Sequence, residues 1–269
     1  RDPARRQVHL PEQALAIHHA GKALRHRRKH SRCAPARGPP AARHSAGEFL
    51  RLPVSARSAA LGGTAVSAGD GAGSIEGNPA GLGWLRRPEG LAAHVEWLGG
   101  VRFESLAGAA PLRGGRLGAL GGQINYLHVS DLLRTDAAGE QNGTFAYRDL
   151  AVRAAYGRLI GETLSAGGVL TFLSETIDDA GGAAVALDVG FQSRPRRWAT
   201  LGAVLQHVGT PLSVGGSGYP HPLTLREGVT VKIHKRRSAR DVVLLSLEGT
   251  QAAFGASDLR GGVEVWPVR

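Results

Sequence analysis

From residue 89 onward the sequence contains ten segments in which apolar and polar side chains alternate, and most of these segments have ten or more residues. Within residues 145–159, Leu150 and Val152 fall on one face of the segment. Asp149 and Arg153 fall on the other face. A period of two is that of a β-strand with one apolar and one wetter face. The predicted strands are 89–97, 101–112, 116–129, 145–159, 163–177, 183–193, 197–208, 223–234, 241–251 and 259–266.

The length of these segments decides between two all-β classes. Strands of soluble proteins average about five to six residues, whereas a tilted strand needs about nine to eleven to cross a bilayer. Short breaks also alternate with longer ones at 130–144 and 209–222, as in membrane barrels. We therefore predict that residues 89–269 form an antiparallel transmembrane outer-membrane β-barrel. A soluble β-sandwich is the alternative, with shorter strands and bulkier residues on both inner faces.

Two features of the predicted barrel need an explanation. Aromatic residues make up only 5% of the chain. This is few for the two rings of aromatic residues that membrane barrels place at the lipid–water interfaces. Glu227 falls on the apolar face of its segment, and a carboxylate in the middle of a membrane is costly. We expect Glu227 to lie near an interface or at a kink made by Gly228.

Residues 47–88 differ from the barrel because small residues and glycines interrupt every regular pattern. Ala and Leu in 56–61 favour a turn or two of helix, which Gly62 would end. Asp70 and Asn78, each followed by Gly or Pro, are turn signals. We predict a short helical and irregular hatch here, which needs the larger barrel to hold it.

Residues 1–46 carry most of the charge of the chain. Eleven Lys/Arg and two acidic residues stand in this stretch, so it accounts for +9 of the net charge of +11. Large apolar residues are scarce there, and we predict a disordered basic tail, possibly non-native sequence in place of a signal peptide. Nucleic-acid binding is not expected. We also expect the sequence to be incomplete at both ends, with C-terminal strands absent, because a membrane barrel must close.

Signatures of catalysis are weak. The run 69–76 resembles a dinucleotide-binding loop, but Glu76 stands where the third glycine belongs. Asp178 and Asp179 fit the tip of a polar hairpin better than a cation site. A G-x-S-x-G nucleophile turn is not found in the sequence. We predict no catalytic residues, no metal and no cofactor, and therefore no enzyme.

Residues 56–63 (ARSAALGG), followed by Asn78-Pro79-Ala80-Gly81-Leu82, resemble the N-terminal signature of the PorV/PorQ proteins. These proteins belong to the wider group of FadL-like outer-membrane barrels. The similarity continues in order through nearly everything after Gly47. The further matching blocks are 96–97, 109–112, 139–145, 188–190, 222–228 and 262–266.

This resemblance implies a bacterial outer-membrane barrel with fourteen strands, of which ten are counted here. Residues 51–84 would form or flank the hatch, and Arg57, Asn78, Pro79 and Ala80 would be its motif, with possible ligand or lumen contacts. The implied function is a component of type IX secretion that handles exported proteins. Its partners would be outer-membrane lipid, other secretion components and the C-terminal domains of cargo.

Two alternatives to type IX secretion stay open. The first is a FadL-like channel for hydrophobic small molecules, which needs an apolar pocket beside the hatch. The second is a structural or adhesive surface barrel. The predicted loop 130–144 is of modest length and does not discriminate between them.

Overall fold

The computed structural model describes residues 45–136, 138–214, 217–234, 242–253 and 256–266. The predicted tail 1–46 lies outside this part of the chain, apart from its last two residues. Among the described residues, no helix is both long enough and apolar enough to cross a membrane.

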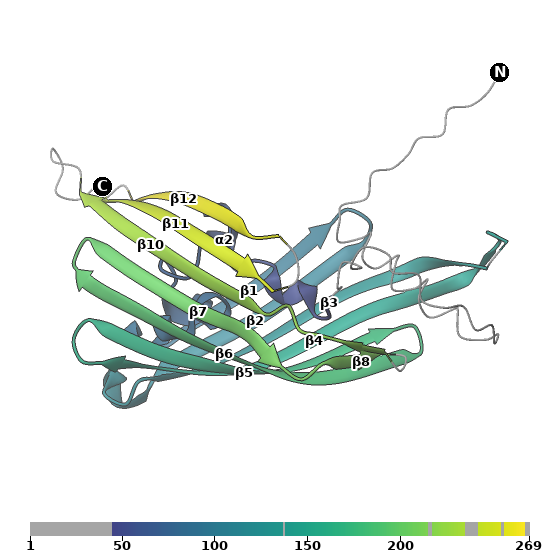
Figure 1. Ribbon diagram of the computed structural model, residues 1–269, viewed down its shortest axis with the longest axis horizontal. Coiled ribbons are helices and arrows are strands. Elements are labelled where there is room, and N and C mark those ends of the chain that lie inside the picture. The colour runs from purple at the N-terminus through teal and green to yellow at the C-terminus, as the bar shows by residue number, and fades with distance from the viewer. Residues whose placement is uncertain (1–44, 137, 215–216, 235–241, 254–255, 267–269) are drawn as a thin grey trace, which may run out of the picture. The chain divides into compact units, whose positions relative to one another are not determined.

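Ten strands form one antiparallel sheet in the order β1-β2-β3-β4-β5-β6-β7-β10-β11-β12 (Figure 1). Each strand pairs with its neighbour along the chain, except that β8 and β9 form a separate two-stranded sheet between β7 and β10. The predicted all-β antiparallel fold is confirmed. The strands are β1 (Glu89–Trp97), β2 (Val101–Pro111), β3 (Ala119–Thr135), β4 (Gln141–Ile160), β5 (Leu164–Ile177), β6 (Ala180–Arg196), β7 (Ala199–Gly209), β8 (Leu212–Val214), β9 (Ser217–Tyr219), β10 (Thr224–His234), β11 (Val242–Ala252) and β12 (Asp258–Trp266).

The prediction of a loop at 130–144 is wrong, because β3 and β4 extend through most of it. Asp131 takes a positive φ of 58° at a bulge, a conformation that aspartate tolerates better than most residues. Pairing then resumes between Leu132 and Phe145. The bulge interrupts the period of two, so the alternation ends in the sequence while the hairpin continues in space.

Two other predicted connections differ from the structure. The turn predicted at 193–196 belongs to β6, which runs to Arg196 and contains Pro195. Between β2 and β3, a 3-10 turn η4 (Leu112–Gly115) delays the start of β3 to Ala119. Gly114, Gly115 and Gly118 all have positive φ there, which a strand does not accommodate.

The burial of the sheet is the reverse of that in a soluble protein. On β4, Leu150, Val152 and Tyr156 point away from the interior and are 36%, 42% and 40% exposed. Asp149 and Arg153 point inward and are 1% and 2% exposed. The same pattern of apolar outside and polar or small inside continues along β6, whereas the inward face of β5 also carries Val169, Leu173 and Ile177.

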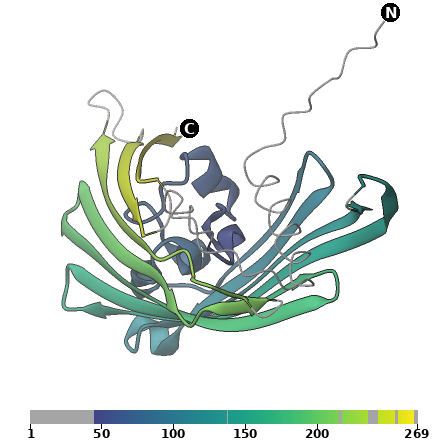
Figure 2. The ribbon, with the colours of Figure 1, turned by 45° about the vertical axis from the view of Figure 1, so that its right-hand side comes forward.

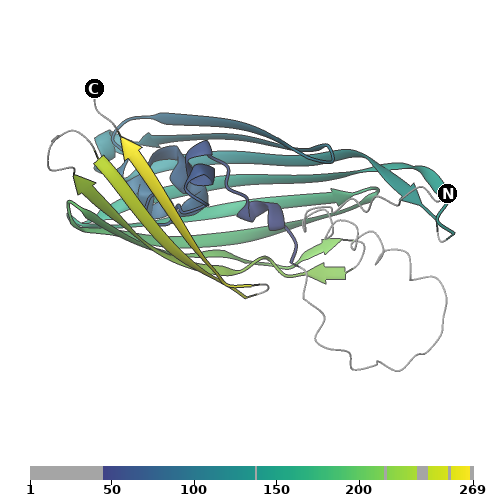
Figure 3. The same ribbon diagram turned by 90° about the horizontal axis from the view of Figure 1, so that it is seen from above.

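The sheet curls around the N-terminal segment, which lies against its inner face (Figure 2). In Figure 3 the purple helices of this segment lie between the blue strands and the yellow strands. The predicted helical and irregular hatch is confirmed as an element of the fold. It contains η1 (Glu48–Arg51), α2 (Ala56–Ala60), η2 (Gly71–Gly73), α3 (Ser74–Gly77) and η3 (Pro79–Trp84).

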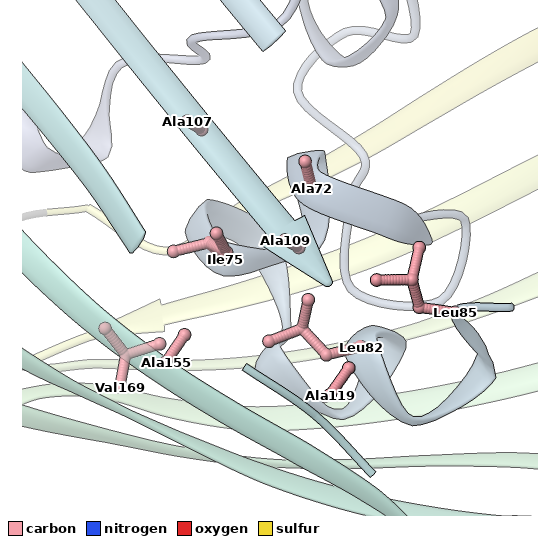
Figure 4. Packing of buried hydrophobic residues seen from close by; sticks show 9 residues of the cluster. All are labelled: Ala72, Ile75, Leu82, Leu85, Ala107, Ala109, Ala119, Ala155 and Val169. Carbon is pink, nitrogen blue, oxygen red and sulfur yellow. The ribbon is translucent and has the colours of Figure 1, made fainter. Parts of the chain in front are cut away.

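An apolar cluster joins the hatch to the inner wall (Figure 4). Ile75 and Leu82 of the hatch are fully buried, and most of their partners on the wall are alanines. Small wall residues let the hatch approach closely. The cluster consists of Ala72, Ile75, Leu82, Leu85, Ala107, Ala109, Ala119, Ala155 and Val169.

Candidate functional site

Asn78 is a hatch residue that bonds to two strands of the wall. Its side chain is fully buried, and its Nδ2 donates to the carbonyls of Val66 (3.0 Å), Phe191 (2.9 Å) and Ala203 (3.4 Å). Its Oδ1 accepts from the Ala80 N–H at 3.1 Å and so caps η3. One side chain therefore ties two parts of the hatch to β6 and β7.

Glycines on the inner wall form the seat of Asn78 and Pro79. A Cβ on Gly157 would lie 2.5 Å from the Pro79 carbonyl oxygen, and one on Gly167 would lie 2.5 Å from the Pro79 carbonyl carbon. A Cβ on Gly190 would overlap Oδ1 of Asn78. These three glycines come from β4, β5 and β6, so only residues without a side chain fit beneath the hatch.

Ala80 is held from the wall by Ser165 of β5. The Ser165 hydroxyl lies 2.6 Å from the Ala80 carbonyl oxygen and 2.9 Å from the Arg158 carbonyl oxygen, two acceptors for its single proton. Pro79 occupies the first position of η3, where its fixed φ suits a helix start and its missing N–H costs nothing.

Arg57 fastens the opposite side of the hatch to β12. Its Nε and Nη2 donate to the Glu264 carboxylate at 2.9 and 2.8 Å. Its Nη1 donates to Asp70 and to the Ala68 carbonyl, both at 3.2 Å. The hydrogen bond to Glu264 raises the pKa of the Arg57 guanidinium further above its ordinary value, against the effect of burial. Arg57 therefore stays charged and links three segments.

A buried ion pair between Arg226 and Glu248 holds the middle of the hatch. The Glu248 carboxylate accepts from the Arg226 Nε at 2.7 Å and from the N–H groups of Ala65 (2.9 Å) and Val66 (3.0 Å). Arg226 also donates to the Gly63 carbonyl at 2.9 Å. The sequence analysis did not single out these two residues. The sequence feature that could have revealed them is a charged side chain on the inward face of a long strand.

Glu76 is the acidic residue of the hatch interior. Its carboxylate accepts from the Val54 N–H at 2.9 Å, and its carbonyl accepts from Gln206 at 2.8 Å. Burial raises the pKa of Glu76 to about 7, although the Val54 hydrogen bond and the charges of Arg153 and Arg226 oppose the rise. Glu76 therefore changes its charge near neutral pH.

A cavity of about 410 Å³ lies between the hatch and the strand ends of β6, β7 and β10. Four arginines and one lysine line it, with Asp70 as the acidic residue among the lining side chains. Arg194 lies over the ring of Trp84, with 4.2 Å between its guanidinium carbon and the ring centroid. The hatch thus meets the wall in a basic environment.

An apolar patch covers the inner wall of β1 to β4. Phe103 is fully buried, with ring centroids 6.1 Å from Trp97 and 6.5 Å from Phe49 of the hatch. Around it the side chains are only partly buried and face inward. We call these seven residues the inner apolar patch: Leu91, Ala93, Val95, Trp97, Val101, Leu132 and Tyr147.

The structure brings three of the four residues of the expected hatch motif together. Asn78, Pro79 and Ala80 contact β4 to β7, whereas Arg57 contacts β12. A ligand role for them stays a prediction. Glu227 points outward as the fourth residue of β10, close to the start of its strand. Within the described ranges, no three His, Cys, Asp or Glu side chains come close enough to share a metal ion.

Comparison with known proteins gives matches among solved structures only. No protein-family model matches the sequence, and no curated protein matches it. Among solved structures, the chain is similar to the ΔS2S3 mutant of TodX, a monoaromatic hydrocarbon channel, with a TM-score of 0.47 and 15% identity. The match covers 77% of this chain and 74% of that chain. Membership of the PorV/PorQ family and of the wider FadL-like group stays a prediction.

Proposed function

We propose that this chain is a hatched outer-membrane β-barrel through which small hydrophobic molecules pass, and that it is not an enzyme. The observation that carries the proposal is the inner apolar patch. The interior of a membrane barrel is ordinarily polar, so inward-facing apolar side chains need a specific reason. Packing against Phe49 of the hatch explains why Phe103 faces inward. Val95, Trp97 and Val101 also face inward, and part of their surface stays exposed. An apolar ligand would cover that surface.

The outer face supports a position in a bilayer. On β4, the outward residues between Arg148 and Arg158 are Leu150, Val152, Ala154 and Tyr156. At about 3.3 Å per residue the two arginines lie ~33 Å apart along the strand. With a strand tilt of about 40°, this spans ~25 Å across the membrane, the height of the apolar band in such barrels.

The hatch supplies the gate in this proposal. It is joined to the wall by Asn78, Arg57 and the Arg226–Glu248 pair, so it holds its place on the inner face. Passage of a ligand requires some of these contacts to break. Charged and hydrogen-bonded contacts can open and re-form, whereas the apolar cluster around Ile75 and Leu82 keeps that part of the hatch on the wall.

Ligand binding tests the proposal. The purified barrel in detergent is titrated with N-phenyl-1-naphthylamine, an apolar probe whose fluorescence rises in an apolar site. Leu91→Gln places an amide in the inner apolar patch and should weaken binding about tenfold, since it removes a buried leucine contact. Leu120→Gln is the matched control, because Leu120 points outward and is 52% exposed.

Equal binding by the two variants would contradict the proposal. The type IX secretion role and the adhesive role stay predictions. A pull-down of cargo C-terminal domains by the purified barrel that is unaffected by Leu91→Gln, combined with no probe binding, would favour secretion over passage.

A further inference from the structure

Three basic residues stand side by side on the outward face of the sheet. Arg102 of β2 lies directly opposite His128 of β3, and His128 lies directly opposite Arg148 of β4. All three have the same strand parity as the outward apolar residues, and both arginines are exposed. We call these residues the basic row. Arg102 and Arg148 lie on either side of His128 and put two positive charges on one sheet face, so the row favours an anionic partner.

The chain itself supplies a carboxylate to only part of the basic row. Glu96 lies 3.5 Å from the Arg102 guanidinium, and both side chains are more than half exposed. In the part of the chain that the structure describes, no carboxylate lies within 4 Å of Arg148 or His128. The His128 ring stacks on Tyr126 at 5.2 Å between centroids. Among the described residues, Arg102 has a carboxylate partner and Arg148 has none.

A groove begins next to the basic row on the same face. It has a volume of about 490 Å³ and lies across β1, β2 and β3. Its walls are mostly apolar, with Ala92, Leu106 and Ile124 exposed along it. Two polar residues of the groove, His94 and Glu104, pair with each other at 2.7 Å. The apolar surface of the groove begins four residues along β2 and β3 from Arg102 and His128, beyond the level of Glu104 and Tyr126.

We propose that the basic row and this groove bind one phosphate-bearing membrane lipid, with the phosphate against Arg102 and Arg148 and an acyl chain in the groove. Arginine binds phosphate through its planar fork of donors. The row stands where the apolar residues of β4 end, at the depth of lipid headgroups in the proposed orientation. The inference rests on the proposed placement of this wall in a bilayer.

Native mass spectrometry of the purified full chain tests the inference. The protein is mixed in detergent with phosphatidylglycerol or with diacylglycerol of the same acyl chains, and retained lipid is counted. We expect retention of phosphatidylglycerol over diacylglycerol. Arg102→Gln and Arg148→Gln should each lower that retention about fivefold. Arg158→Gln is the matched control, because Arg158 is an outward arginine on the same strand that lies outside the row.

Ala92→Trp fills the groove and leaves the arginines in place, so it should also lower retention of phosphatidylglycerol. The inference is overturned if both lipids are retained equally, if Arg158→Gln acts like Arg148→Gln, or if Ala92→Trp has no effect. Competition by free glycerol phosphate as strong as by the lipid would also overturn it. A protein that folds in detergent and fails to insert into vesicles contradicts the proposed placement as well. Insertion without phosphate preference contradicts this inference alone.

Discussion

At the scale of single residues, Asn78 joins stretches of chain that are far apart in the sequence. It caps η3 through its oxygen and holds β6 and β7 through its nitrogen. Asparagine is suited to this position because its amide has donors and an acceptor in one compact group. Aspartate offers no donor, and serine is too short to reach both sides.

We predict that Asn78→Ala lowers the free energy of unfolding by about 2–4 kcal/mol. The substitution leaves buried carbonyls of Val66 and Phe191 without a donor. Chemical unfolding in detergent, followed by circular dichroism, measures the change. Asn142→Ala, at an exposed position near the start of β4, is the control. A loss below about 0.5 kcal/mol for both variants would contradict the role of Asn78.

Glu76 predicts a pH dependence of stability. Its folded pKa of about 7 lies above its ordinary value of 4.5, so the folded state holds this proton over that interval while the unfolded state releases it. Stability should therefore be highest below pH 4.5 for this group and fall as the pH rises to 7. The contribution lost is on the order of 3 kcal/mol.

Glu76→Gln keeps the shape of the side chain and removes its titration. Unfolding curves of both proteins from pH 4 to 8 should diverge, with the variant gaining on the parent protein as the pH rises. Arg153 and Arg226 are the charged neighbours of Glu76. Parallel pH profiles for the two proteins would show that Glu76 does not titrate in this window.

At the scale of elements, the hatch and the wall fit because glycines on three strands face the same two hatch residues. The alternation of each strand is readable alone, but the coincidence of Gly157, Gly167 and Gly190 is not. They belong to three different strands, and only the register of these strands places the three glycines next to each other. The seat is thus a property of the sheet and not of any one segment.

Gly167→Ala should weaken the docking of the hatch. A Cβ at this position would lie 2.5 Å from the Pro79 carbonyl group, which is backbone and cannot move without shifting η3. We expect a loss of about 1–3 kcal/mol in unfolding free energy. Gly168→Ala is the neighbouring control, since its nearest contact is at 3.4 Å. Limited proteolysis of the hatch should also accelerate in Gly167→Ala and stay unchanged in Gly168→Ala.

At the scale of the whole molecule, the position of each apolar side chain depends on the solvent of the outer face. Leu187 lies in the middle of β6 and points outward with 46% of its surface exposed. In water this exposure would be a liability, and in lipid it is favourable. In the proposed placement, the same side chains that would drive aggregation of a soluble sheet would stabilise this one in a bilayer.

Leu187→Arg tests this placement. At the middle of the apolar band an arginine should cost about 2–4 kcal/mol, and near its edge about 0–1 kcal/mol. Leu164→Arg at the start of β5 is the edge control. Urea unfolding in lipid vesicles measures both. Similar costs for the two variants would place Leu187 outside the bilayer core.

The sequence by itself determined the ten strands, their antiparallel class and the irregular hatch, because period-two alternation and glycine-rich interruptions are local signals. It also indicated Asn78-Pro79, since both residues set turns by their own chemistry. Only the tertiary structure decided that Glu248 and Arg226 hold the hatch, and that Arg102, His128 and Arg148 form one row. Such sets depend on strand register, which is fixed by the pairing of segments far apart in the chain.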